Sequence, residues 1–245
     1  MSAVEISTLA SRAAALIDLG REAEALPLLH QTLTTAPDDP RLLDLLAQVQ
    51  SEMGDHAAAC ETALRLVAVS PHSYRGHLLA SISELKRRHR TQAIAHARHA
   101  VQLAPNSPGT HAQLAQALAG RRRWRKQALF SAIRAIELAP DSASGYQAAG
   151  YVEFARGRRR HAEVWYRRAL ELDPTAVVAQ TNLAILNRAG GRMNSAFSDI
   201  QSVLRLDPKD AMARRLLDDL VYTSINNLLW VLLALALVVA ALRGG

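Results

Sequence analysis

The chain has 245 residues, 49% hydrophobic and 21% charged, which excludes wholesale disorder and allows one or two globular domains. Its single cysteine excludes an internal disulfide framework. The formal net charge of +7 is unevenly spread, with 4 basic and 10 acidic side chains in residues 1–70 but 21 and 9 in residues 71–208. Abundant alanine and few aromatic residues favour helix over strand.

A period of about 34 residues runs through most of the sequence. Its markers are prolines, each with an alanine twelve residues before it: Pro37, Pro71, Pro105, Pro140, Pro174 and Pro208, with Ala25, Ala59, Ala93, Ala128, Ala162 and Ala196. Small residues on one helix face let a second helix approach closely, and proline ends the helix that precedes it. Glycine stands seventeen residues before four of the prolines (Gly20, Gly54, Gly157 and Gly191), where it can end the preceding helix.

These residues resemble the tetratricopeptide repeat (TPR) family over about residues 6–208. The best copy is 143–174, with Tyr146, Ala149-Gly150, Gly157, Ala162, Tyr166, Ala169 and Pro174 in the family's order. The resemblance implies an all-α fold, a right-handed α-solenoid of six TPR helix-turn-helix repeats at approximately 6–39, 40–73, 74–107, 108–142, 143–176 and 177–209. Two copies depart from the pattern, with Arg88 and Arg123 at the turn glycine, and the fourth has one extra residue near 120–123.

The C-terminal part predicts two further elements. A capping helix is expected at 210–222, because a repeat stack must cover its last outer face. Residues 228–242 carry no polar side chain, so a tail-anchor-like transmembrane helix is expected at 223–243; the alternative is a helix packed on protein. The N-terminus lacks the features of a secretory signal. The predicted location is therefore a single-pass membrane protein with a cytoplasmic N-terminal domain, in a bacterial inner membrane.

The resemblance also implies an inner groove lined by the first helix of each pair. The expected groove residues are Leu78, Ile82, Leu85, Gln147, Tyr151, Phe154 and Ile185. Apolar groups on a concave face suit an amphipathic helix or an extended peptide, although they could instead pack against the neighbouring repeat. The lysine and asparagine clamp of chaperone-binding members is absent, so a chaperone tail is not predicted as the ligand.

Basic clusters recur at the repeat spacing and predict a ridge along the turns. Its residues are Lys86, Arg87, Arg88, Arg90, Arg121, Arg122, Arg123, Arg125, Lys126, Arg156, Arg158, Arg159 and Arg160. They are either solvated turns or a surface for anionic lipid headgroups or an acidic protein. Nucleic acid is disfavoured because only Trp124 stands among the arginines.

No motif predicts chemistry. His96 and His99 are three residues apart on a helix, but no cysteine or carboxylate completes a metal set, so we predict no metal and no cofactor. Cys60 is expected to be packed or idle. The repeats leave no room for a catalytic domain, which predicts that the chain is not an enzyme.

The sequence therefore predicts a membrane-tethered scaffold or adaptor that binds a partner peptide or helix. One alternative is a structural subunit of a larger membrane complex, and another is a targeting or regulatory fragment of a larger enzyme. A homodimer stays open, because the acidic first 70 residues could meet the basic ridge of a second copy or could simply be solvated.

Overall fold

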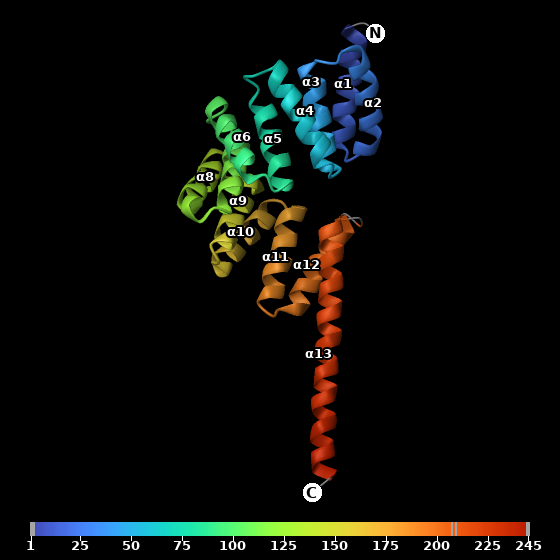
Figure 1. Cartoon of the computed structure of the whole chain (residues 1–245), viewed down its shortest axis with the longest axis vertical. Helices are drawn as coiled ribbons and strands as arrows, with labels where there is room; N and C mark the ends of the chain where they lie inside the picture. The colour runs from blue at the N-terminus through green and yellow to red at the C-terminus, as the bar shows by residue number, and fades with distance from the viewer. Residues whose placement is uncertain (1–2, 207, 209, 244–245) are drawn as a thin grey trace. The chain divides into compact units, whose positions relative to one another are not determined.

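A computed structural model describes residues 3–206, 208 and 210–243, and the side chains of 3, 211, 227 and 230–243 lie outside this description. The chain divides into two compact units, unit 1 (Met1–Arg156) and unit 2 (Gly157–Gly245). Within the described residues all regular structure is helical, with thirteen α-helices and one short 3₁₀ helix (Figure 1). The prediction of an all-α repeat fold is confirmed, while the handedness of the superhelix stays a prediction.

Unit 1 holds the first four helix pairs and one further helix. Its elements are α1 (Ala3–Asp18), α2 (Glu22–Thr35), α3 (Pro40–Glu52), α4 (His56–Val69), α5 (Tyr74–Lys86), α6 (Arg90–Leu103), α7 (Pro108–Ala119), the 3₁₀ helix η1 (Arg122–Trp124), α8 (Arg125–Leu138) and α9 (Ala143–Ala155). Each helix packs on the next, and the first helices of successive pairs also pack on each other. This double contact is what a helical repeat needs to form a continuous core.

Unit 2 holds the remaining helices. They are α10 (Arg159–Leu172), α11 (Val177–Ala189), α12 (Met193–Leu206) and α13 (Ala211–Arg243). Helices α10, α11, α12 and α13 pack in succession, and α13 also contacts α11. The boundary between the units falls inside the fifth predicted repeat, between its two helices.

Alanines of the second helices lie on the buried faces of the pairs. All six alanines that precede the repeat prolines by twelve residues are completely buried: Ala25, Ala59, Ala93, Ala128, Ala162 and Ala196. Capping side chains begin several helices, since Asp39, Ser73 and Ser142 each accept a hydrogen bond from a backbone N–H of the following turn. The sequence period thus reappears as a period of packing.

Five of the six turns within the pairs contain a residue in the left-handed conformation. Four of them use glycine with φ between +68° and +83°, at Gly20, Gly54, Gly157 and Gly191, where the missing Cβ removes the steric cost. In the third pair Arg88 adopts the same conformation with φ +68°. The fourth pair differs, because its extra residue is taken up by the 3₁₀ helix η1.

A recurrent hydrogen bond joins three helices, α7, α11 and α13, to the turn that precedes each of them. In each case a side-chain nitrogen lies within hydrogen-bond distance of the carbonyl oxygen of the repeat proline six residues earlier. The distances are 2.8 Å from His111 to Pro105, 2.6 Å from Gln180 to Pro174 and 2.8 Å from Arg214 to Pro208. In these three places a polar side chain satisfies a carbonyl that the turn leaves without a helical partner.

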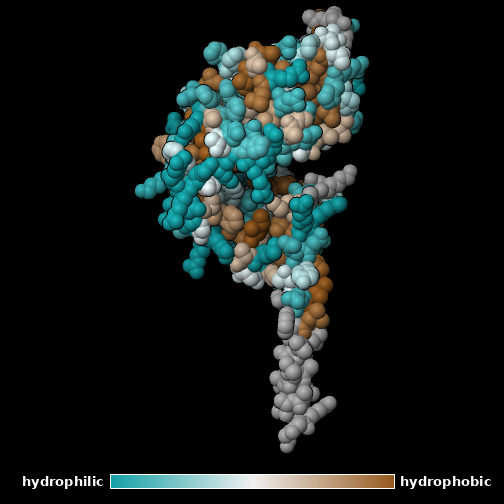
Figure 2. Space-filling view, viewed as in Figure 1, coloured by the Kyte–Doolittle hydropathy of each residue, from teal (hydrophilic) through white to brown (hydrophobic). Residues whose placement is uncertain are grey.

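Helix α13 is continuous over 33 residues, so the predicted capping helix 210–222 and transmembrane helix 223–243 are one element. Its first turns pack through Ala213, Leu216 and Leu220 on α11 and α12. Farther along, Ile225, Leu228 and Leu229 are exposed, and Figure 2 shows hydrophobic side chains on this part of α13.

Much of the predicted span falls on residues 230–243, whose side chains lie outside the described set. Among the residues that the structure does describe, no helix combines the length and the apolar character needed to cross a bilayer. The structure therefore gives no support to the predicted transmembrane helix.

Candidate functional site

A cavity of about 370 Å³ lies between α3 and α5, the first helices of the second and third pairs. Its lining residues are Gln48, Ser51, Glu52, Arg75, Leu78, Leu79 and Ile82. Leu78 and Ile82, both predicted groove residues, are half-buried, so part of each side chain is open to solvent. They follow each other by four positions and therefore share one face of α5. The wall that they form is apolar, and the α3 side is polar.

Two carboxylates on the α3 side have different partners. Asp44 accepts hydrogen bonds from Nε of Arg75 at 2.7 and 2.8 Å, which offsets its charge. Glu52 accepts a bond from the amide of Gln48 at 3.0 Å. Burial raises the pKa of both carboxyls, and repulsion from Glu22 adds to the rise at Glu52. The rim of the cavity at Glu52 is therefore a negative site without a neutralising cation among the described contacts.

The other predicted groove residues lie elsewhere. Leu85 is on the last turn of α5, and Gln147, Tyr151 and Phe154 are on α9; all four are half-buried. Ile185 belongs to unit 2 and packs against the core cluster of α11, α12 and α13, so much of its surface is used in packing. The structure thus brings Leu78 and Ile82 together at one cavity and leaves the role of the others a prediction.

The predicted basic ridge occupies the turns within the pairs. In unit 1, the clusters 86–90 and 121–126 are neighbours, because Nη2 of Arg121 donates to the hydroxyl of Thr91, the residue after Arg90, at 3.2 Å. Gly120 also lies directly against the guanidinium of Arg90. Arg156 ends this unit and bonds Glu153 at 2.9 Å. These contacts make the two central clusters one basic surface of unit 1.

In unit 2 the remaining ridge residues lie at the start of α10, with Arg158 just before the helix and Arg159 and Arg160 at its first two positions. Arg158, Arg159 and Arg160, with Gly157 and His161, line an open hollow of about 650 Å³. Arg159 donates to the carbonyl oxygen of Ala189 at 3.1 Å. Whether these arginines continue the basic surface of unit 1 stays a prediction.

Two arginines lie against the ring of Trp124, Arg123 from its own cluster and Arg98 from α6. The guanidinium carbons of Arg98 and Arg123 lie 4.8 and 5.1 Å from its ring centre, within the range of cation–π attraction. The sequence identified Trp124 as the only aromatic residue in its cluster, but it gave no sign that Arg98, on α6, would stack on it.

Three histidines come together between α5 and α6. Nδ1 of His77 lies 3.1 Å from Nδ1 of His96, and the ring of His99 stacks on His77 with centres 5.3 Å apart. Burial lowers the pKa of His77 and His96, and repulsion among the rings adds to the effect. In the part of the chain that the structure describes, no group of three or more histidine, cysteine or acidic side chains has a geometry suited to a metal ion.

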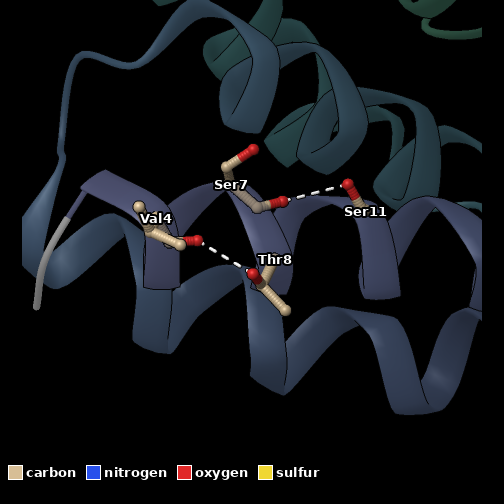
Figure 3. Close-up of a pocket in the computed structure, with 4 residues that line it drawn as sticks. All are labelled: Val4, Ser7, Thr8 and Ser11. Atoms are coloured by element: carbon tan, nitrogen blue, oxygen red, sulfur yellow. Dashed lines mark hydrogen bonds between the residues drawn. The ribbon is translucent and has the colours of Figure 1, made fainter.

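Another hollow, of about 480 Å³, lies on α1 and is lined by Val4, Ser7, Thr8 and Ser11 (Figure 3). The hydroxyl of Thr8 donates to the carbonyl oxygen of Val4 at 2.9 Å, and that of Ser11 to Ser7 at 3.0 Å. These hydroxyl hydrogens are used by the helix backbone, so the hollow presents no convergent set of donors to a ligand.

Comparisons with known proteins agree with the repeat architecture. A family model described as tetratricopeptide repeat matches residues 143–175, the copy in which the sequence pattern is clearest. No curated protein matches the sequence significantly. The family match covers one repeat of the chain.

Several solved structures are similar. A chain of the APC/C hetero-tetramer Cut9–Hcn1 has a TM-score of 0.70 and 14% identity, over 88% of this chain and 42% of that one, so this chain spans less than half its length. MamA 41-end from Desulfovibrio magneticus RS-1 has a TM-score of 0.55 and 17% identity, over 70% of this chain and 96% of that one. MamA MSR-1 C2 has a TM-score of 0.52 and 19% identity, over 70% of this chain and 98% of that one. These similarities show the fold, a TPR-like helical repeat.

Proposed function

We propose that this chain is a protein-interaction scaffold that binds a partner peptide or helix in the cavity between α3 and α5. The observation that carries the proposal is the cavity itself, an open hollow with an apolar wall and a polar rim. The TPR-like fold supports it, because repeat solenoids offer extended surfaces for partner chains. The proposal includes no catalytic step.

The lining indicates which peptide would fit. Leu78 and Ile82 offer an apolar wall for one aliphatic or aromatic side chain. Glu52 and Gln48 lie across from them and offer oxygen acceptors, and the Glu52 carboxylate favours a cation. Asp44 contributes less to this field, because Arg75 neutralises it at 2.7 Å. The matching partner is therefore a segment with an apolar anchor next to a lysine or arginine.

A peptide library selected on the full chain would test this. We expect enrichment of peptides with an apolar residue close to a basic one. Binding of a selected peptide should fall at least about tenfold in Ile82→Glu, because a buried charge would then line the apolar wall. Glu52→Gln should weaken the binding of peptides that contain the basic residue and leave the binding of peptides without it unchanged.

A matched control is Phe130→Glu, because Phe130 is an exposed apolar side chain on α8 (72% exposed) outside the cavity. Its binding should equal that of the native chain. If Ile82→Glu binds the selected peptides as tightly as the native chain does, this cavity is not the site. If Phe130→Glu alone loses binding, the partner docks on α8.

Attachment to a membrane stays a proposal that rests on the sequence of 223–243. It would place the scaffold on the cytoplasmic face of a bacterial inner membrane. Fractionation of the full chain tests it: the native chain should be recovered with membranes, and Leu232→Arg/Leu235→Arg should be released, because arginine in the middle of a span is costly. Recovery of the native chain in the soluble fraction would contradict the tether. Co-purification with other membrane subunits at fixed stoichiometry would favour the assembly-subunit alternative.

A further inference from the structure

The turns within the helix pairs of unit 1 form an edge whose charge changes sign. The acidic half comprises the first two turns, with Asp18, Glu22, Glu24, Glu52 and Asp55 and the single cation Arg21. The basic half comprises the next two turns, 86–90 and 121–126. We call the four turns together the turn edge. Between Glu84 and Glu137 the sequence has 11 basic residues and no acidic one.

The four turns are neighbours in space. Glu22 of the first turn is close enough to Glu52 of the second to raise its pKa. His56 of the second turn has its pKa lowered by burial and by Lys86 of the third. Arg121 of the fourth turn bonds Thr91 at the start of α6. The charge pattern along the turn edge is therefore two negative turns followed by two positive ones.

Within the described residues little of this charge is neutralised inside the molecule. On the acidic half the one ion pair joins Arg21 and Glu24 at 2.6 Å. On the basic half Arg87 lies 3.7 Å from Glu84, and the same carboxylate also bonds His89 at 2.7 Å. Like charges gathered on each half raise the free energy of the isolated chain, and a complementary surface would relieve that repulsion.

Each half also exposes a side chain that can serve as an anchor. On the acidic half Leu19 and Met53 precede the turn glycines and are 69% and 50% exposed. On the basic half Trp124 is half-buried, and Arg98 and Arg123 lie against its ring. Apolar and aromatic anchors surrounded by charges are typical of protein interfaces.

We propose that two copies of this chain pair antiparallel through the turn edge. A two-fold axis then places the acidic half of each copy on the basic half of the other, so both contacts form at once. A membrane or a nucleic acid presents negative charge throughout and would be repelled by the acidic half. An antiparallel second copy is complementary in charge to both halves of the turn edge, and for this reason we propose a second copy as the partner.

Salt dependence is the first test, since exposed ion pairs are individually weak and strongly screened. Sedimentation velocity of the full chain should show dimers at about 50 mM NaCl. The dissociation constant of the dimer should be at least about tenfold higher at about 500 mM NaCl. A chain that stays monomeric at low salt overturns the proposal. So does a dimer that salt does not weaken, because its contact must then lie elsewhere, for example on α13.

Charge exchange is the decisive test. Glu22→Lys/Glu52→Lys cancels the net charge of the acidic half, and Lys86→Glu/Arg122→Glu places two negative charges among the cations of the basic half. Each variant should self-associate at least about tenfold more weakly than the native chain. Their equimolar mixture should recover dimers. In the mixed pair one contact is still the native basic half on the native acidic half, and in the other contact the introduced lysines face the introduced glutamates.

Charge-matched controls reverse residues away from the turn edge. Asp38→Lys/Glu61→Lys and Arg65→Glu/Arg134→Glu change the net charge equally and should dimerise like the native chain at the same salt. Equal weakening by controls and edge variants would overturn the proposal, because net charge would then be the cause. Binding of anionic vesicles or RNA by a monomeric native chain would also overturn it and assign the basic half to a polyanion.

Discussion

Nδ1 of His89 lies 2.7 Å from Oε2 of Glu84, while the other oxygen of that carboxylate accepts a bond from the Cys60 thiol at 3.3 Å. Glu84 is a buried charge, 7% exposed, at the end of the first helix of its pair. The thiol comes from the preceding pair, so one carboxylate joins two repeats. Burial and the proximity of Glu84 raise the pKa of Cys60, which keeps this sulfur a thiol that can donate.

Removing this carboxylate should destabilise the repeat stack. We expect Glu84→Ala to lower the free energy of unfolding by about 2–3 kcal/mol, because His89 and Cys60 lose a buried partner. His89→Ala should cost only about 1 kcal/mol, since the carboxylate keeps its other contacts. Urea denaturation measures both. Glu137→Ala, an exposed carboxylate paired with Arg134, is the control and should change stability by less than about 0.5 kcal/mol.

Arg88→Gly should stabilise the chain by about 1 kcal/mol, because arginine at φ +68° carries the steric cost of the left-handed region that glycine avoids. Gly54→Ala is the converse change at the equivalent turn. No atom lies within 4 Å of a Cβ added there, so only the backbone conformation is affected, and stability should fall by about 1 kcal/mol. The Tm should therefore rise in Arg88→Gly and fall in Gly54→Ala. A lower Tm in Arg88→Gly than in the native chain would contradict this account.

Gly145→Ala should destabilise the contact between α8 and α9 by about 1–3 kcal/mol. A Cβ at this position would lie 2.9 Å from the backbone nitrogen of Ile136 and 3.2 Å from the backbone carbon of Ala135, and a helix backbone cannot give way locally. Gly120→Ala is the comparison: its Cβ would meet the end of the Arg90 side chain, which can rotate away. Equal stability of Gly145→Ala and the native chain in chemical denaturation would show that α8 and α9 can separate slightly.

Stability should fall as the pH drops below neutrality. Burial lowers the pKa of His77 and His96, with His99 adding repulsion and Glu84 partly opposing the shift at His96. The folded chain therefore disfavours the proton; its stability is complete above the unfolded pKa of about 6.5 and is lost as the pH falls from there through the folded values. Urea midpoints between about pH 7.5 and 5.5 should fall less in His77→Gln than in the native chain. His30→Gln, at an exposed position, should retain the native pH dependence.

The sequence predicted the period well because its markers are local. Glycine at the turns, proline after the second helix and alanine on the close-packed face each act within a few residues, and the structure has helices at those places. It did not predict the hydrogen bonds to the proline carbonyls, made by His111, Gln180 and Arg214. A signal was present, since polar residues recur six positions after the prolines, but nothing in the pattern says whether such a side chain points to solvent or to a backbone oxygen.

A second recurrent position was also missed. Buried polar side chains stand twenty-one residues before four repeat prolines, at Gln50, Glu84, Glu153 and Asn187. Two of them bond the second helix of the same pair, Gln50 accepting from Thr62 at 2.8 Å and Asn187 donating to Asp199 at 2.6 Å. A polar residue in the last turn of a helix is predicted from sequence to be exposed to solvent. Only the packing of the helices in the structure shows that these four side chains are buried.

The amino-acid sequence by itself determined that this is a chain of paired helices with a fixed period, because turn, cap and close-contact preferences depend on neighbours along the chain. Only the tertiary structure decided which side chains meet: Leu78 and Ile82 at a cavity with Glu52, Arg98 on Trp124, and Cys60 on Glu84. These contacts join residues from different helices, and their geometry depends on how far each helix is rotated about its axis when it packs. A rotation of one residue, about 100°, would replace every one of these partners while leaving the sequence pattern unchanged.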